Sequence, residues 1–478
     1  MSISREIIKH IPFSPTPEQK EAAFRFEKFI TSDLPRCLFL IKGYAGTGKT
    51  TFIAALTEAL QHRGIKTVLL APTGKSAKVL ASYTGKKAST IHRHIYSYKK
   101  TPYTFSLQLA HNRFKNTLFI VDEVSLISTR KNAFTDDAFS SRDLLEDLLT
   151  YIFGGKNCKA VFVGDDAQLP PVHQSESLAL NWRFLRDRFD LNMGYVKMTT
   201  VVRQEHESGI LYNASLLRKF IENRQTGFQF RIDGFDDVRF VESGEVFEEL
   251  ESAFSVFGNK ETVVLTRSNK RANMFNQQIR RGILWMENEI DAGDEIMAVK
   301  NNYFWLDEQS PVGFIANGET MEILSVLRTE EKYGLRFADL VVKMSDYPDH
   351  PEIDVKVILD TLYENAPSLS SDKMDELHRK IMEELDENNP ELSHREKLMK
   401  IEQNPYYNAL QIKFSYAITT HKSQGGQWDA VFIDQGYITE EQINTDYYRW
   451  LYTAVTRAKQ KLYFINFSKI FFENLEDF

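Results

Sequence analysis

Residues 43–50 read Gly-Tyr-Ala-Gly-Thr-Gly-Lys-Thr and fit the pattern G-x-x-x-x-G-K-[ST]. An apolar run precedes them and a helix-like segment follows, which argues against a chance match in a turn. Such a loop points backbone N–H groups at phosphates, and the following helix adds its partial positive charge. Lys49 can reach the β and γ phosphates, and Thr50 can bind Mg²⁺. The residues predicted to hold ATP here are Gly43, Ala45, Gly46, Thr47, Gly48, Lys49, Thr50 and Thr51.

Two adjacent carboxylates, Asp122 and Glu123, follow a buried strand-like run at 118–121. Asp122 can hold Mg²⁺ together with Thr50, and Glu123 can orient and deprotonate the attacking water. A lone Asp-Glu pair is weak evidence, but downstream of a P-loop it predicts ATP hydrolysis. Gln168 follows the next such strand, where its amide could sense the γ-phosphate or the attacking water.

Two further side chains admit a functional and a structural interpretation. Gln19 stands near the start of a helix capped by Thr16, and its amide could clamp adenine or be solvated. Arg203 ends the first half of the chain, where it could act as an arginine finger or lie on the surface.

Residues 72–77, Pro-Thr-Gly-Lys-Ser-Ala, again join a buried strand to a helix. Such loops lie at the ligand-binding edge of an open α/β sheet, where hydroxyls, amides and Lys75 could hold a second set of phosphates. An ordinary turn between strand and helix is the alternative.

The segment 96–116 differs from its surroundings because it mixes Tyr and Phe with Lys and Arg. Alternation over 103–109 and a turn at 99–102 predict a small β-hairpin. Interleaved aromatic and cationic side chains suit stacking on bases and contact with phosphates. A small satellite core with a solvated face is the alternative.

The second half predicts another α/β unit with an insertion. A strand at 261–266 leads into a helix at 271–281, and short strands at 291–345 predict a small β-barrel. Residues 346–402 hold 16 Asp/Glu and 7 Lys/Arg, and helical spacing there predicts an acidic helical hairpin at about 346–405. This arm could be a solvated packing element or could bind a protein partner.

Composition sets the general class of the protein. The 478 residues are 42% hydrophobic and 26% charged, which is typical of soluble globular proteins. The net charge of −7 lies in the acidic segment, so the remainder is slightly positive and can hold a basic groove. Two cysteines exclude a disulfide framework, and no apolar run suggests a signal or membrane segment. We therefore expect a cytoplasmic protein.

Several motifs occur in the order found in superfamily 1 helicases, and together they resemble the motifs of that family. They lie at residues 43–50, 72–77, 122–125, 164–172 and 202–204. Their amino-acid sequences resemble those of the RecD-like and Dda-like branch, superfamily 1B. Residues 411–427 and 450–459 resemble the fifth and sixth motifs. The resemblance implies an α/β fold with two RecA-like P-loop cores, an inserted β-hairpin in the first core, and an SH3-like β-barrel plus helical insertion in the second. The expected domains are 1–203 with a hairpin at about 92–116, 204–290 with 409–478, and an insertion at 291–408.

The same resemblance implies roles for residues of the later motifs. Arg457 would be a second arginine finger, and Gly425 would face the nucleotide. Contacts with nucleic acid are expected from Pro72, Thr73, Lys75, Ser76, His92, Thr420, His421 and Ser423.

Taken together, these features predict an ATP-dependent, Mg²⁺-dependent DNA helicase. Its polarity of 5′→3′ and its preference for DNA are implied by the resemblance alone. The expected partners are single-stranded DNA and duplex junctions, with no membrane, and a monomeric motor. A translocase that does not separate strands, or a nucleotide-gated binding module, would be the alternatives.

Overall fold

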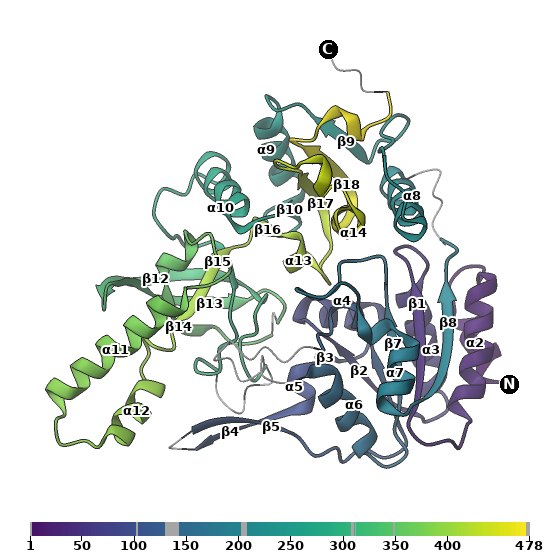
Figure 1. Cartoon of the computed structure of the whole chain (residues 1–478), viewed down its shortest axis with the longest axis horizontal. Coiled ribbons are helices and arrows are strands. Elements are labelled where there is room, and N and C mark those ends of the chain that lie inside the picture. The colour runs from purple at the N-terminus through teal and green to yellow at the C-terminus, as the bar shows by residue number, and fades with distance from the viewer. Residues whose placement is uncertain are drawn as a thin grey trace.

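The computed structural model describes residues 2–101, 104–129, 143–201, 208–306, 310, 312–347 and 349–474. Two parallel sheets, a closed barrel and a helical arm make up the molecule, and Figure 1 shows the barrel beside both sheets with the arm on its far side. Within the described ranges, no helix is long and apolar enough to cross a membrane.

The first sheet is wholly parallel, in the order β3-β2-β6-β7-β1-β8. Alternate residues of β1 are buried on opposite faces of the sheet, Phe39 and Ile41 on one and Leu38 and Leu40 on the other. Among the described residues, four helices cover the first face and three cover the second. The strands are β1 (Cys37–Gly43), β2 (Lys66–Ala71), β3 (Ala88–Thr90), β6 (Thr117–Val121), β7 (Lys159–Gly164) and β8 (Asn192–Met198). The helices are α1 (Ile3–His10), α2 (Pro17–Ile30), α3 (Lys49–Gln61) and α4 (Gly74–Thr84), then α5 (Ile91–Ile95), α6 (Leu144–Gly154) and α7 (Trp182–Phe189).

The second sheet is also parallel, in the order β16-β10-β17-β18-β9. Helices α8 (Gly209–Asn223) and α14 (Thr445–Val455) pack on one face, and α9 (Val246–Phe257) and α10 (Asn269–Gln278) pack on the other. The two-core α/β prediction is confirmed. The strands are β9 (Val238–Val241), β10 (Thr262–Thr266), β16 (Ala417–Thr419), β17 (Trp428–Asp434) and β18 (Ala458–Ile465), and the short helix α13 (Thr420–Ser423) follows β16.

The predicted barrel is present as a closed ring of β11 (Glu295–Ala298), β12 (Thr320–Lys332), β13 (Leu335–Met344), β14 (Ile353–Ile358) and β15 (Leu410–Phe414). Its apolar interior is continuous with the core beneath α9 and α10. The barrel is therefore fused to the second sheet through one hydrophobic core.

Two boundaries of the insertion differ from the prediction. Residues 353–358 were expected in the acidic arm but form β14, and residues 410–414 were expected in the second core but close the barrel as β15. Both runs are buried strands, and a local pattern does not determine which neighbour a strand pairs with. The remaining domain limits stay predictions.

The helical arm is consequently shorter, with α11 (Ser371–Asn388) and α12 (His394–Glu402). On α11, Leu377 and Ile381 are buried against the barrel beside Phe337. Ser393 and Glu396 form a capping box at the start of α12.

The inserted hairpin is formed by β4 (Tyr96–Thr101) and β5 (Thr104–Leu109), which pair in antiparallel fashion. It follows α5 directly, and Figure 1 shows it extending away from the first sheet on the side of the barrel. The prediction of a hairpin is confirmed, although residues 102–103 lie outside the described ranges.

A buried ion pair ties the first core to the barrel. Arg93 of α5 bonds to the Glu319 carboxylate and the Tyr347 hydroxyl, and its Nη2 donates to the Phe314 carbonyl at 3.0 Å. Only 7% of the Arg93 side chain and 3% of the Glu319 side chain are exposed. Burial raises the pKa of Glu319 to about 7, while Arg93 opposes this rise. Because both charges are desolvated, the pair is costly to break from one side only.

Replacing Arg93 by Met should therefore lower the free energy of unfolding by about 3–5 kcal/mol, because it leaves a buried carboxylate without a counter-charge. The double variant Arg93→Met/Glu319→Gln should recover most of this loss. A folded-state pKa above the unfolded value means that stability is lost as pH rises through it, so the single variant should be less destabilised at pH 6 than at pH 8. Urea unfolding at both pH values measures this.

Arg379→Met is the matched control, because it breaks the exposed pair with Glu383. This control should change stability by less than about 0.5 kcal/mol. An equal effect of both variants would contradict the proposed importance of the buried pair.

Candidate nucleotide site between the two cores

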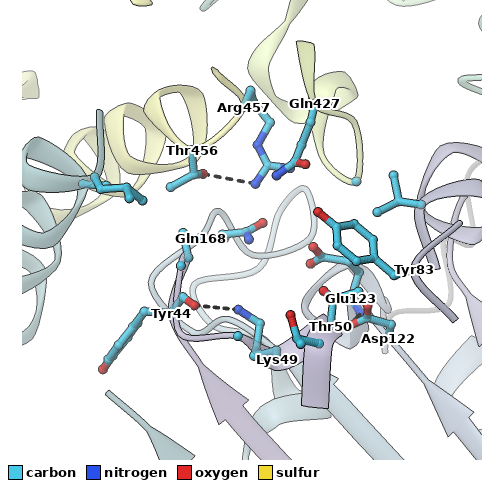
Figure 2. A pocket seen from close by; sticks show the side chains of 18 of the residues that line it. Tyr44, Lys49, Thr50, Tyr83, Asp122, Glu123, Gln168, Gln427, Thr456 and Arg457 are labelled. Atoms are coloured by element: carbon cyan, nitrogen blue, oxygen red, sulfur yellow. Dashed lines mark hydrogen bonds between the residues drawn. The ribbon is translucent and has the colours of Figure 1, made fainter. Parts of the chain in front are cut away.

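The P-loop connects β1 to α3 at the carboxyl edge of the first sheet. Gly46 and Gly48 have φ angles of 76° and 77°, in the left-handed region that favours glycine. A Cβ on Gly46 would lie 3.1 Å from Val201, so the loop also has little space there. Lys49 begins α3, and its Nζ donates to the Tyr44 carbonyl at 2.9 Å across the loop (Figure 2). The spacing of the motif thus places a helix N-terminus and an ammonium group beside one cavity.

The two carboxylates end β6 on the same wall of this cavity (Figure 2). Asp122 is buried, and its burial together with the nearby charge of Glu123 raises the pKa of Asp122 to about 7. Glu123 has a φ of 52°, a strained conformation for a residue other than glycine. Two close carboxylates and the Thr50 hydroxyl are hard oxygen donors, and a divalent cation would relieve their repulsion. These residues therefore fit Mg²⁺.

The opposite wall comes from the second core. Arg457 is 4% exposed and is held by three bonds: Nε donates to the Thr453 carbonyl at 3.0 Å, Nη1 to the Gly426 carbonyl at 3.2 Å, and Nη2 to the Thr456 hydroxyl at 3.1 Å. Burial lowers the pKa of this guanidinium, and the charge of Glu123 raises it. Figure 2 shows Arg457 facing the P-loop, with Gln168 between them. The Oε1 atom of Gln168 is buried without a partner among the described residues, so it can accept a hydrogen bond from a ligand.

Hydrogen bonds cross directly between the cores at this point. The Tyr452 hydroxyl of α14 donates to Asp165 Oδ2 at 2.7 Å and accepts from the P-loop amide Ala45 N at 2.9 Å. Burial raises the pKa of Tyr452 well above its usual value, so the hydroxyl stays a donor. In addition, Leu169 N donates to the Thr453 hydroxyl at 2.8 Å. Sequence reasoning missed Tyr452 and Asp165, although both lie inside motifs that it had identified.

Most of the residues predicted to bind the nucleotide line one cavity of about 230 Å³. It is bordered by Ala45, Gly46, Gly48, Lys49, Thr50, Thr51, Asp122, Glu123, Gln168, Gly425 and Arg457, and also by Phe13, Tyr83 and Gln427, which the sequence did not single out. Gly43 and Thr47 lie behind the loop and shape it, since the Thr47 hydroxyl donates to the Tyr44 carbonyl at 2.8 Å. Arg203 lies outside the described residues.

Gln19 is fully buried and does not line this cavity. Its Oε1 accepts from Thr16 N at 3.1 Å in a capping box at the start of α2, and its Nε2 donates to the Thr47 carbonyl at 3.3 Å. The side chain thus connects α2 to the P-loop. A contact with adenine stays a prediction, and it would require the amide to exchange one of these bonds.

The loop at residues 72–77 contacts the second core, and its predicted contact with DNA phosphates stays a prediction. Ser76 borders the nucleotide cavity, and a Cβ on Gly425 would lie 1.9 Å from its hydroxyl, so only glycine fits there. The Thr73 hydroxyl accepts from Ser76 N at 3.2 Å as the cap of α4, and Pro72 before it is half-buried. Lys75 Nζ lies 4.8 Å from the centre of the Trp428 ring.

The other residues expected at nucleic acid differ in exposure. Thr420 and Ser423 are fully buried, and the Ser423 hydroxyl donates to the Thr420 carbonyl at 2.8 Å. A phosphate contact from either hydroxyl would require α13 to rearrange, so this role stays a prediction. His421 is exposed beside a second cavity, of about 530 Å³. His92 is half-buried, and burial lowers its pKa to about 4, so its ring is neutral at neutral pH.

Comparison with known proteins agrees with this geometry. Residues 15–225 match the model of an AAA domain, and residues 414–465 match the UvrD-like helicase C-terminal domain. The chain is 25% identical over 339 residues to the ATP-dependent DNA helicase dda of Enterobacteria phage T4, covering 66% of this chain and 72% of that protein. It is 23% identical to the uncharacterized protein R530 of Acanthamoeba polyphaga mimivirus, over 94% of this chain and 99% of that one.

A shorter region is 36% identical over 138 residues to the ATP-dependent RecD2 DNA helicase of Deinococcus radiodurans, covering 28% of this chain and 16% of that protein. Among solved structures, Pif1 helicase from Bacteroides is similar at 17% identity and a TM-score of 0.47, over 96% of this chain and 95% of that one. The matched regions contain the P-loop, the acidic pair and Arg457, which the fold brings to one cavity. These matches support a superfamily 1B helicase of the RecD and Dda type.

Proposed function

We propose that this protein is an ATP-dependent DNA helicase that moves along single-stranded DNA in the 5′→3′ direction and separates duplex DNA. In this proposal, ATP hydrolysis is coupled to closure of the cleft between the two cores. The observation that carries it is the shared cavity, in which Lys49, Asp122 and Glu123 come from one core and Arg457 comes from the other. The polarity is supported by the resemblance of the motifs to those of superfamily 1B.

Each wall of the cavity has its own part in hydrolysis. Lys49 and the P-loop amides would bind the β and γ phosphates, Thr50 and Asp122 would hold Mg²⁺, and Glu123 would orient and deprotonate the attacking water. Mg²⁺, when bound, supplies charge neutralisation at these phosphates. Arg457 would stabilise the charge that develops on the γ-phosphoryl group, an effect worth about 10³–10⁵ in rate for arginine fingers. Arg203 would act as the other arginine finger.

Cleft closure follows from where these charges lie. A bound γ-phosphate attracts Lys49 and Arg457 from opposite sides, so it stabilises the closed state more than the open one. Closure would move Tyr452 relative to the P-loop and so act on the conformation of this loop, because the Tyr452 hydroxyl accepts a hydrogen bond from Ala45 N. If both cores hold one DNA strand, repeated closing and opening would advance it.

The expected partners are single-stranded DNA, a duplex junction and a protein that binds the helical arm. DNA would cross both cores near His421, and the β4–β5 hairpin would meet the duplex at the junction. The arm of α11 and α12 carries exposed acidic side chains, which would suit a basic protein partner rather than DNA. A monomeric motor and a cytoplasmic location stay predictions from the sequence.

Lys49→Ala and Glu123→Gln should each lower kcat for ATP hydrolysis by about 10³-fold, because they remove a phosphate ligand and the water-activating carboxylate. Phosphate release in the presence of single-stranded DNA measures this, and circular dichroism checks the fold. Lys87→Ala and Glu251→Gln, both at exposed positions, are the matched controls. Hydrolysis at the wild-type rate in Lys49→Ala or Glu123→Gln would reject the assignment.

Tyr452→Phe should lower DNA-stimulated kcat by about tenfold, because it leaves Asp165 and the Ala45 amide without their shared partner at a buried site. Basal ATP hydrolysis without DNA should fall less, since the P-loop and the acidic pair are unchanged. Tyr448→Phe is the control, because this tyrosine lies on the same helix but its hydroxyl accepts from Gly227 N within the second core. Equal behaviour of the two variants would contradict a role for Tyr452 in coupling.

Unwinding of duplexes with a 5′ or a 3′ single-stranded tail tests activity and polarity in one experiment. We expect ATP-dependent strand separation with the 5′ tail only. DNA-stimulated hydrolysis without strand separation on either substrate would favour the alternative, a translocase that does not unwind. Preferential unwinding from the 3′ tail would overturn the proposed direction.

A further inference from the structure

A second group of potential metal ligands lies on the outer face of the first core. Glu6 and His10 are four residues apart on α1, and Glu58 and His62 are four residues apart at the end of α3. This spacing places both members of each pair on one face of their helix. The two helices pack against each other, so the pairs meet.

The contacts within this group are close. Ligand atoms of Glu6, His10 and His62 all lie within 4.8 Å of one another. His62 Nδ1 is 3.4 Å from Glu6 Oε1, and the rings of His10 and His62 are 5.1 Å apart between centroids. Glu6 and His10 are half-buried and His62 is exposed, so an ion can enter from solvent.

Glu58 completes the arrangement from the other side of His62. Its Oε1 lies 3.3 Å from His62 Nε2, the ring nitrogen that faces away from Glu6. A metal-bound histidine typically donates its second N–H to a carboxylate, which fixes the ring and increases the electron density on the ligating nitrogen. The glutamate is thus placed to orient His62 with Nδ1 toward Glu6 and His10.

We propose that Glu6, His10 and His62 bind a divalent transition-metal ion, Zn²⁺, with Glu58 as the positioning residue of His62. Two imidazoles and one carboxylate form a ligand set that suits zinc and leaves a fourth position for water. Bonds of about 2.0–2.1 Å require the ligand atoms to approach one another further, which rotation of the two rings can provide. Arg63 donates to Glu6 Oε2 at 2.8 Å, and its charge will weaken the site, so we expect micromolar affinity.

This site is separate from the nucleotide cavity. Helix α3 begins at Lys49 and ends next to His62, so the two sites lie about 20 Å apart along its axis, at about 1.5 Å per residue. The ion would tie the N-terminal helix α1 to the far end of the P-loop helix. It would stabilise the first core without taking part in hydrolysis.

The direct test is titration of the purified, chelator-treated full chain with Zn²⁺ against a chromophoric zinc chelator. Millimolar Mg²⁺ is kept present so that the nucleotide site does not take up zinc. We expect one equivalent of zinc to bind with micromolar affinity, and we expect binding to raise Tm. His10→Ala and His62→Ala should each weaken binding at least about tenfold, and Glu58→Gln should weaken it by about tenfold through the lost orientation of His62.

His394→Ala is the matched control, because this exposed histidine lies on the distant arm and should leave zinc affinity unchanged. All three histidine variants should retain ATP hydrolysis, since none of these side chains borders the nucleotide cavity. Absence of micromolar binding in the wild type, or unchanged binding and Tm shift in the double variant His10→Ala/His62→Ala, would overturn the proposal.

Discussion

The hydroxyl of Tyr452 connects the two halves of the nucleotide site. It bonds to Asp165 at the end of one strand of the first sheet and to Ala45 N in the P-loop, although Tyr452 itself belongs to α14 of the second core. Tyr452 and Asp165 are buried, so loss of their bond would leave an unsatisfied polar group. The relative position of the cores is therefore tied to the conformation of the P-loop, and a ligand that changes one must act on the other.

The barrel adds a second constraint on how the cores can move. Its interior is continuous with the core beneath α9 and α10, so barrel and second sheet behave as one packed unit. On its other side, the buried pair of Arg93 and Glu319 attaches the barrel to α5 of the first core. The hairpin β4–β5 begins directly after α5. Any rotation between the cores thus acts on the ion pair at the base of this hairpin.

Much of the site followed from local sequence. The P-loop and the acidic pair each depend on a short segment between a strand and its next element, and parallel strands bring such segments to one sheet edge. Predictions failed where the partner was distant. Residues 353–358 and 410–414 were assigned to the helical arm and to the second core, but both form barrel strands. The sequence of a buried strand has the same apolar pattern whichever neighbouring strand it pairs with. Ser76 borders the nucleotide cavity next to Gly425, a position that its own segment did not predict, and its contact with DNA stays a prediction.

By itself, the sequence determined the P-loop, the acidic pair and the two-core α/β organisation, because glycine spacing and apolar strand runs act through neighbouring residues. Only the tertiary structure decided which side chains face each other across the cleft. Ala45 and Tyr452 are 407 positions apart, and their bond exists because two separately folded sheets pack at one angle. No local pattern encodes that angle, since it depends on the summed packing of both cores and of the barrel that contacts them.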